Sequence, residues 1–132
     1  MATNILLITH GRIGEELLES ARLTFNNALP THCQCLSIVL NCDPERMIDD
    51  AQPLIKTLTT SADLLILTDL FGATPSNIAH QLAQQHANVN VITGVNLPML
   101  IRVLNYAGAP IDELLQKAVS GGQDGILLAQ PK

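Results

Sequence analysis

Aromatic side chains are scarce in this sequence. Its 132 residues include no Trp, one Tyr and two Phe, although 47% of the residues are hydrophobic. The interior must therefore be built from Leu, Ile, Val and Ala, a composition that suits packed helices and parallel strands. The same scarcity leaves little to stack against a flavin ring.

Charged residues are few as well. They make up 14% of the chain, and the formal net charge is −5. The seven basic residues are scattered along the sequence, whereas binding to a nucleic-acid backbone depends on clustered Lys and Arg. We therefore expect no nucleic-acid partner.

Long hydrophobic runs and paired cysteines are also missing. The apolar run near the N-terminus covers only Ile5 to Ile8, which is too short for a signal peptide or a membrane span. We expect a cytoplasmic protein with no membrane insertion. Three cysteines in a chain with no secretion signal do not indicate a disulfide framework. Cys33 and Cys35 have no CxxC or HxxxH motif beside them, so we predict thiols buried on a strand and no metal site.

The chain does contain a regular alternation of short β-rich runs and segments with helical spacing. This pattern predicts one α/β domain over residues 1–132, with a doubly wound, mainly parallel sheet. We take the strand order to be 2-1-3-4. The predicted strands cover residues 3–9, 33–40, 63–68, 89–95 and 125–129. The predicted helices cover residues 14–28, 44–58, 74–86 and 98–106, followed by one from residue 111 that ends at Gly121-Gly122.

The spacing of apolar residues predicts which face of each helix is buried. The expected stripes of the first two helices are Ile13, Leu17, Ala21 and Phe25, and Met47, Ala51, Leu54 and Leu58. Asp43-Pro44 and Thr74-Pro75 each combine a capping residue with proline at the first helical position.

Polar clusters follow three of the predicted strands. They are Thr9-His10-Gly11 after the first strand, residues 69–77 after the third and residues 96–99 after the fourth. In an open parallel α/β sheet, ligands bind beyond the carboxyl ends of the strands, where the winding direction reverses. The order 2-1-3-4 puts this reversal between the first and third strands, so we expect His10 to lie beside Asp69.

A histidine beside a carboxylate at such an edge is suited to act as a nucleophile. Neutral imidazole offers a lone pair on one ring nitrogen at cytoplasmic pH. Asp69 is expected to accept a hydrogen bond from the other nitrogen, which fixes the tautomer and stabilises positive charge on the ring. We expect Nε2 of His10 to take a phosphoryl group, because Asp69 is better placed to hold the Nδ1 proton.

Space and hydrogen-bond donors for the phosphoryl group are expected around this pair. Gly11 leaves room beside the ring, while Gly72, Ala73 and Thr74 bring backbone N–H groups to a helix N-terminus, where phosphate oxygens are favoured. Three further residues are candidate walls of the site: Phe71, Asn96 and Met99. We expect the site to need no metal and no cofactor, because the backbone donors and the helix end would offset the charge of the phosphoryl group.

Each of these residues also has an ordinary explanation. His10 taken alone is more often a satisfied polar residue than a nucleophile, and an Asp at a strand end commonly caps a turn. Thr74-Pro75 is a common way to start a helix, and Met99 is more often a core residue. The functional interpretation depends on their convergence at one crevice. The other three histidines, His32, His80 and His86, lack this context and are expected on the surface.

Three ordered motifs closely resemble a known family over essentially the whole chain. They are T-H-G at the end of the first strand, D-L-F-G-A-T-P-S-N after the third and G-V-N-L-P-M-L after the fourth. The chain resembles the enzyme IIA domain of the mannose family of the bacterial sugar phosphotransferase system. This resemblance implies a phosphotransferase in which His10 receives a phosphoryl group from the histidine phosphocarrier protein and passes it to a histidine of enzyme IIB. Asp69 would support His10.

The resemblance also implies a homodimer in which the last strand, residues 125–129, is antiparallel and crosses to the partner subunit. The family commonly has Trp, Gly and Ser where this chain has Phe71, Ala73 and Thr74. Backbone groups would still supply most of the phosphate contacts. Some members continue into a fused IIB domain, whereas this sequence stops at Lys132, so we expect a free-standing IIA.

Three alternatives remain open. The first is a regulatory phosphocarrier of an incomplete phosphotransferase system that transports no sugar. The second is a flavodoxin-like module that binds a nucleotide or flavin, although no GxGxxG or Walker A loop is present. The third is a hydrolase using Ser76, which no GxSxG motif surrounds. The sequence specifies neither the sugar nor the cognate IIB.

Overall fold

The computed structural model describes residues 2–131 as four strands and five helices that alternate along most of the chain. The order is β1 (Asn4–His10), α1 (Ile13–Thr24), β2 (Cys33–Ile38), α2 (Pro44–Leu58), β3 (Leu64–Thr68), α3 (Thr74–Gln85), β4 (Val89–Thr93), α4 (Leu97–Asn105) and α5 (Ile111–Asp124). The first four strands of the sequence prediction and all five helices are present, with boundaries shifted by a few residues.

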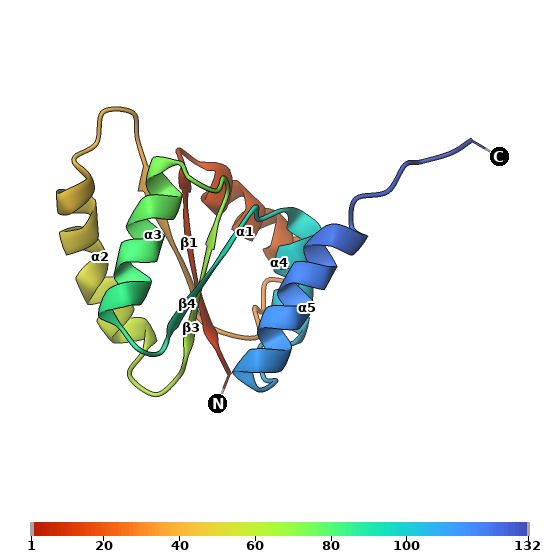
Figure 1. Cartoon of the computed structure of the whole chain (residues 1–132). Coiled ribbons are helices and arrows are strands. Elements are labelled where there is room, and N and C mark those ends of the chain that lie inside the picture. Colours follow the sequence, from red (N-terminus) through yellow and green to blue (C-terminus); the bar gives the residue numbers. More distant parts are fainter. Residues whose placement is uncertain (1, 132) are drawn as a thin grey trace.

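The four strands form one sheet in the order β2-β1-β3-β4, and every neighbouring pair is parallel (Figure 1). The strand order and the central place of the third strand, in which every residue is buried, are confirmed. In this register His10 lies opposite Ile38 of β2, while Ile8 lies opposite Thr68 of β3. The carboxyl ends of β1, β2 and β3 therefore meet at one edge.

Helices cover both faces of the sheet, which confirms the doubly wound arrangement. Figure 1 shows α2 and α3 on one face and α1, α4 and α5 on the other. Leu6 and Ile8 of β1 pack in the core under α2 and α3, whereas Ile5 and Leu7 pack in the core on the opposite face. Because strand side chains alternate between faces, the side chain of His10 belongs to the α2 and α3 face.

Of the two helix starts predicted from a capping residue followed by proline, one is confirmed. Asp43 accepts a hydrogen bond from the backbone N–H of Glu45 at 3.1 Å and caps α2, with Pro44 next. Asn96 caps α4 in the same way. At α3 the expected cap, Thr74, is instead the first helical residue, and Ala73 holds the cap position.

The buried stripes of α1 and α2 are rotated relative to the prediction. Ile13 is 46% exposed, and α1 buries Gly14, Leu18 and Ala21. In α2 the buried residues are Ile48, Ala51, Ile55 and Leu58, so Met47 and Leu54 lie at the margin of the core. A shift of one residue turns the helix by about 100°, and apolar residues on adjacent positions left this phase ambiguous.

The last predicted strand, residues 125–129, is not formed within this single chain, and its exchange with a partner subunit stays a prediction. Helix α5 continues through Gly121 and Gly122 to Asp124, and within the described residues 125–131 no strand forms. The glycines do not end the helix because close packing requires them: a Cβ at Gly121 would lie 2.6 Å from Cβ of Arg102 in α4. The following segment leads away from the body of the molecule (Figure 1).

Two of the three cysteines sit on the edge strand β2, and none of the three forms a disulfide. Burial, together with a smaller effect of the neighbouring Cys35, raises the pKa of Cys33 to about 12. Burial likewise raises the pKa of Cys35 to about 11. These thiols therefore stay protonated at neutral pH.

Candidate active site

The residues predicted to carry the chemistry meet at the carboxyl edge of the sheet. His10 is the last residue of β1, and Asp69 directly follows β3. Because β1 and β3 are neighbours with Ile8 opposite Thr68, the two side chains come together although 59 positions separate them in the sequence.

One carboxylate oxygen of Asp69 contacts His10 twice. Oδ2 lies 2.8 Å from the ring Nδ1 and accepts the backbone N–H of His10 at 3.2 Å. A carboxylate oxygen accepts, so we assign the ring proton to Nδ1. This leaves Nε2 with its lone pair. The His10 side chain is 48% exposed and that of Asp69 is 11% exposed, which suits a reactive group that is open to solvent with a partner that is held in place.

The chain around His10 is fixed on both sides. The buried Thr9 accepts the backbone N–H of Gly14 through Oγ1 at 2.8 Å and so anchors the start of α1. Gly11 has a φ of +48°, in the left-handed region, and its N–H donates to the carbonyl of Ile38 at 2.9 Å. These bonds hold the turn that presents the imidazole.

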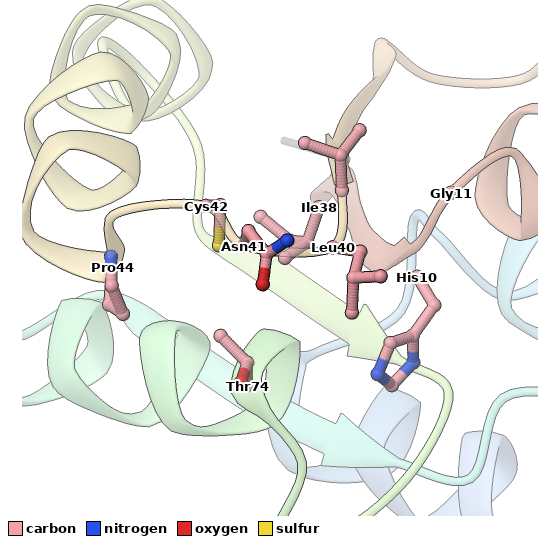
Figure 2. Close-up of a pocket in the computed structure, with 9 residues that line it drawn as sticks. His10, Gly11, Ile38, Leu40, Asn41, Cys42, Pro44 and Thr74 are labelled. Atoms are coloured by element: carbon pink, nitrogen blue, oxygen red, sulfur yellow. The ribbon is translucent and has the colours of Figure 1, made fainter.

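A cavity of about 600 Å³ opens beside His10 on the α2 and α3 face. Figure 2 shows the His10 ring at one end and Pro44 at the other, with Asn41 and Leu40 along one side and Thr74 along the opposite side. The full lining is His10, Gly11, Ile38, Val39, Leu40, Asn41, Cys42, Pro44 and Thr74. The site is therefore bounded by three loops of the sheet edge.

The four residues predicted to bind phosphate are not equivalent. Gly11 and Thr74 line the cavity. However, the N–H groups of Gly11 and Ala73 already donate to backbone carbonyls, the latter to Leu70 at 3.3 Å. Gly72 has a φ of +83° and lines a second, neighbouring cavity. The backbone supplies fewer free donors here than the sequence suggested.

The predicted wall residues do not line the cavity beside His10. Phe71 is 82% exposed and faces the second cavity, together with Ser76. Asn96 accepts the N–H of Met99 at 2.9 Å and donates to the carbonyl of Gly122 at 3.1 Å, while Met99 is buried in the core. The placement of Asn96 and Met99 is explained by the packing of α4 against α5.

The sequence analysis missed the loop after β2. It contributes Val39, Leu40, Asn41 and Cys42 to the cavity, whereas the sequence analysis considered only Asp43 of this loop, as a helix cap. The signal that was available is topological: in the order 2-1-3-4 the strand beside β1 must also bring its carboxyl end to the site.

Two buried oxygens near the pair have no hydrogen-bond partner among the described residues. They are Oγ1 of Thr68 and Oδ1 of Asp69.

Within residues 2–131, no group of three or more His, Cys, Asp or Glu side chains is placed to hold a metal ion. No helix that the structure describes is long and apolar enough to cross a bilayer.

Comparison with known proteins gives a consistent result. A model of the EIIA-man family, described as the PTS system fructose IIA component, matches residues 4–119. The chain is 28% identical to the PTS system mannose-specific EIIAB component of Escherichia coli strain K12 over 134 residues, which cover 100% of this chain and 41% of that protein. It thus spans about two fifths of the length of these mannose-specific relatives. It is also 35% identical over 51 residues to the PTS system fructose-specific EIIA component of Bacillus subtilis strain 168, covering 39% of this chain and 35% of that protein.

Solved structures share the architecture along the full chain. The mannose/sorbose specific IIA subunit of the phosphotransferase system from Enterococcus faecalis superposes with a TM-score of 0.84 at 25% identity, covering 100% of this chain and 98% of the other. The PTS IIA protein associated with the fucose utilization operon of Streptococcus pneumoniae has a TM-score of 0.82 at 22% identity, over 97% and 96% of the two chains.

Proposed function

Because this chain belongs to the EIIA-man family of phosphotransferase system IIA components, we propose that it is a phosphocarrier of sugar uptake. His10 accepts a phosphoryl group from the histidine phosphocarrier protein and transfers it to an enzyme IIB. The observation that carries this proposal is the 2.8 Å contact between Nδ1 of His10 and Oδ2 of Asp69 at the carboxyl edge of the sheet.

The proposed step is an in-line displacement on phosphorus. The Nε2 lone pair of His10 attacks phosphorus while the P–N bond of the donor breaks, and the electron pair of that bond returns to the donor ring. That ring leaves as neutral imidazole when its other nitrogen carries a proton. The Nδ1 proton of His10 stays in place, so the phosphorylated ring is positively charged and is stabilised by Asp69 at 2.8 Å.

Thr74 supports the phosphoryl group from the opposite side of the cavity. It is the first residue of the 12-residue helix α3 and lines the cavity together with His10. Its hydroxyl and the positive end of the helix dipole favour an anion at this position. A second transfer, to a histidine of enzyme IIB, follows the same course in reverse.

A labelling assay tests the proposal. The protein is incubated with phosphoenolpyruvate, enzyme I and the histidine phosphocarrier protein, and acid-labile phosphate is measured with and without an enzyme IIB. We expect one labelled histidine that His10→Ala abolishes and a discharge by IIB. His80→Ala is the matched control, since this exposed histidine lines the second cavity. Labelling that survives in His10→Ala would contradict the assignment. A protein that is labelled but never discharged by any IIB would favour the regulatory alternative.

We propose in addition that the protein is a homodimer, in which residues 125–129 add a strand to the partner subunit. Ile126, Leu127 and Leu128 are 75%, 82% and 82% exposed in the isolated chain. The strand β4 at the end of the sheet offers unpaired backbone groups on its outer side. A cytoplasmic location remains a prediction from the sequence.

A further inference from the structure

The loop between β2 and α2 presents one polar side chain to the cavity. Asn41 has a φ of +65°, in the left-handed region, which Asn tolerates better than other residues with a side chain. The residue is exposed and lines the cavity with His10 and Thr74. In Figure 2 its amide lies between Cys42 and Leu40 and faces Thr74 across the cavity.

Few side chains that line the cavity beside His10 can donate a hydrogen bond. A phosphoryl group carries a charge of about −2 and three acceptor oxygens. The N–H groups of Gly11 and Ala73 are already bonded within the chain, and the Thr74 hydroxyl offers one donor. Of the nine side chains and glycines that line the cavity, Asn41 alone carries an amide, with two N–H donors. The two loop residues that precede it, Val39 and Leu40, are apolar.

We propose that the Asn41 amide donates hydrogen bonds to the oxygens of the phosphoryl group on His10, so that the group is held between Asn41 and Thr74. This inference rests on the proposed phosphocarrier function and adds a contact that no sequence motif indicated. Asn41 exchanges no proton in the transfer. It stabilises the charge on the equatorial oxygens while the donor P–N bond breaks and the bond to Nε2 forms.

Two substitutions of Asn41 distinguish the effect of its side-chain amide from that of its backbone conformation. Asn41→Gly keeps the left-handed conformation at no steric cost and removes the amide. Asn41→Asp keeps the shape and replaces the donors by a negative charge. The control is Asn27→Gly, because Asn27 is also exposed, has a φ of +63° and follows α1 outside this cavity.

The measured quantity is the rate of His10 phosphorylation by two donors. One is the phosphorylated histidine phosphocarrier protein. The other is phosphoramidate, a small donor whose P–N bond breaks as ammonia leaves, so that no protein docking is involved. We expect Asn41→Gly to slow both reactions by about ten- to hundredfold, the range for a lost hydrogen bond to a charged group. Asn41→Asp should be slower still, and Asn27→Gly unchanged.

The two donors distinguish a failure of the Asn41 inference from a failure of the proposed phosphocarrier function. A slow-down with the protein donor alone would overturn the inference and make Asn41 a docking residue. Equal rates for Asn41→Gly and wild type with phosphoramidate would also overturn it. If phosphoramidate labels His10 of the wild type and the phosphocarrier protein does not, the proposed donor is wrong, while the comparison of variants still decides the role of Asn41. If neither donor labels His10, both proposals fail.

Discussion

Asp69 holds His10 by its ring and by its backbone through the same oxygen. Oδ2 lies 2.8 Å from Nδ1 and 3.2 Å from the backbone nitrogen of His10. Two contacts at one acceptor fix the rotation of the imidazole relative to the strand that carries it. The direction of the Nε2 lone pair is thereby set before any donor arrives, which lowers the entropic cost of transfer.

Replacing Asp69 should therefore slow the chemistry without unfolding the protein. We expect Asp69→Ala to reduce the rate of phosphoryl transfer to His10 by about ten- to hundredfold, since ring orientation and charge stabilisation are lost together. The far-ultraviolet circular dichroism spectrum should not change. Rapid-quench measurement of labelling gives the rate. Transfer as fast as in the wild type would show that the contact has no role in the reaction.

The part of the site at the ends of β1 and β3 was predicted from the sequence, whereas the part formed by the loop after β2 was not. His10 and Asp69 were placed together correctly because the strand order alone brings their carboxyl ends to one edge. The cavity wall after β2 was missed because Val39 and Leu40 look like the end of a buried strand, whereas they are 62% and 90% exposed. Hydrophobicity does not distinguish a core residue from an exposed apolar loop.

The ends of helices could be predicted only where local sequence signals determine them. Asp43-Pro44 fixed the start of α2 because capping and proline geometry agree there. Gly121-Gly122 did not end α5, because Gly121 allows the close approach to Arg102 of α4 and Gly122 that to Met99. Sequence spacing cannot reveal which neighbour a glycine faces. The segment after residue 124 forms no strand within the described residues, so the predicted exchange stays a proposal.

The start of α1 should be sensitive to one methyl group. A Cβ at Gly14 would lie 3.0 Å from Oγ1 of Thr9 and 3.1 Å from Cβ of Leu7, both parts of the buried strand β1. We expect Gly14→Ala to lower the free energy of unfolding by about 1–3 kcal/mol, although Ala favours helix formation. Urea denaturation followed by circular dichroism measures the change.

Gly108→Ala is the matched control for this substitution. A Cβ there would meet nothing within 4 Å, so its effect should stay within about 0.5 kcal/mol of the wild type. Equal stability of the Gly14→Ala and Gly108→Ala variants would mean that the strand yields to the extra methyl, and the tight packing of α1 on β1 would not matter.

The thiols of β2 should react only at high pH. Their ordinary pKa of 9.0 is raised to about 12 for Cys33 and about 11 for Cys35, and only the thiolate is alkylated. At pH 8 iodoacetamide should modify them roughly a thousandfold and a hundredfold more slowly than in urea-unfolded chains, since each pKa unit is a factor of about ten. Peptide mass spectrometry resolves the sites. Equal rates in folded and unfolded protein would contradict the burial.

The same pKa shifts predict a loss of stability in alkali. The unfolded chain releases these thiol protons near pH 9, before the folded chain does, near pH 11 to 12. The buried neutral thiols therefore contribute fully to the free energy of unfolding below pH 9. This contribution disappears as the pH rises through the pKa values of the folded chain. A Cys33→Ala, Cys35→Ala double variant should lose stability less steeply between pH 9 and 11 in urea titrations. Parallel curves for the two proteins would refute this linkage.

The apolar segment that follows α5 should control the oligomeric state. Ile126, Leu127 and Leu128 expose most of their surface in the isolated chain, and contiguous exposed apolar surface marks interaction sites. Sedimentation equilibrium should give a dimer for the full chain and a monomer for a chain ending at Asp124 or carrying Leu127→Asp, since a charge in a paired strand is costly. Leu23→Asp is the control, because Leu23 is 71% exposed at the end of α1 and its substitution should leave the dimer intact. A full-length monomer, or a dimer that survives the truncation, would rule out the strand exchange and leave the segment to another partner.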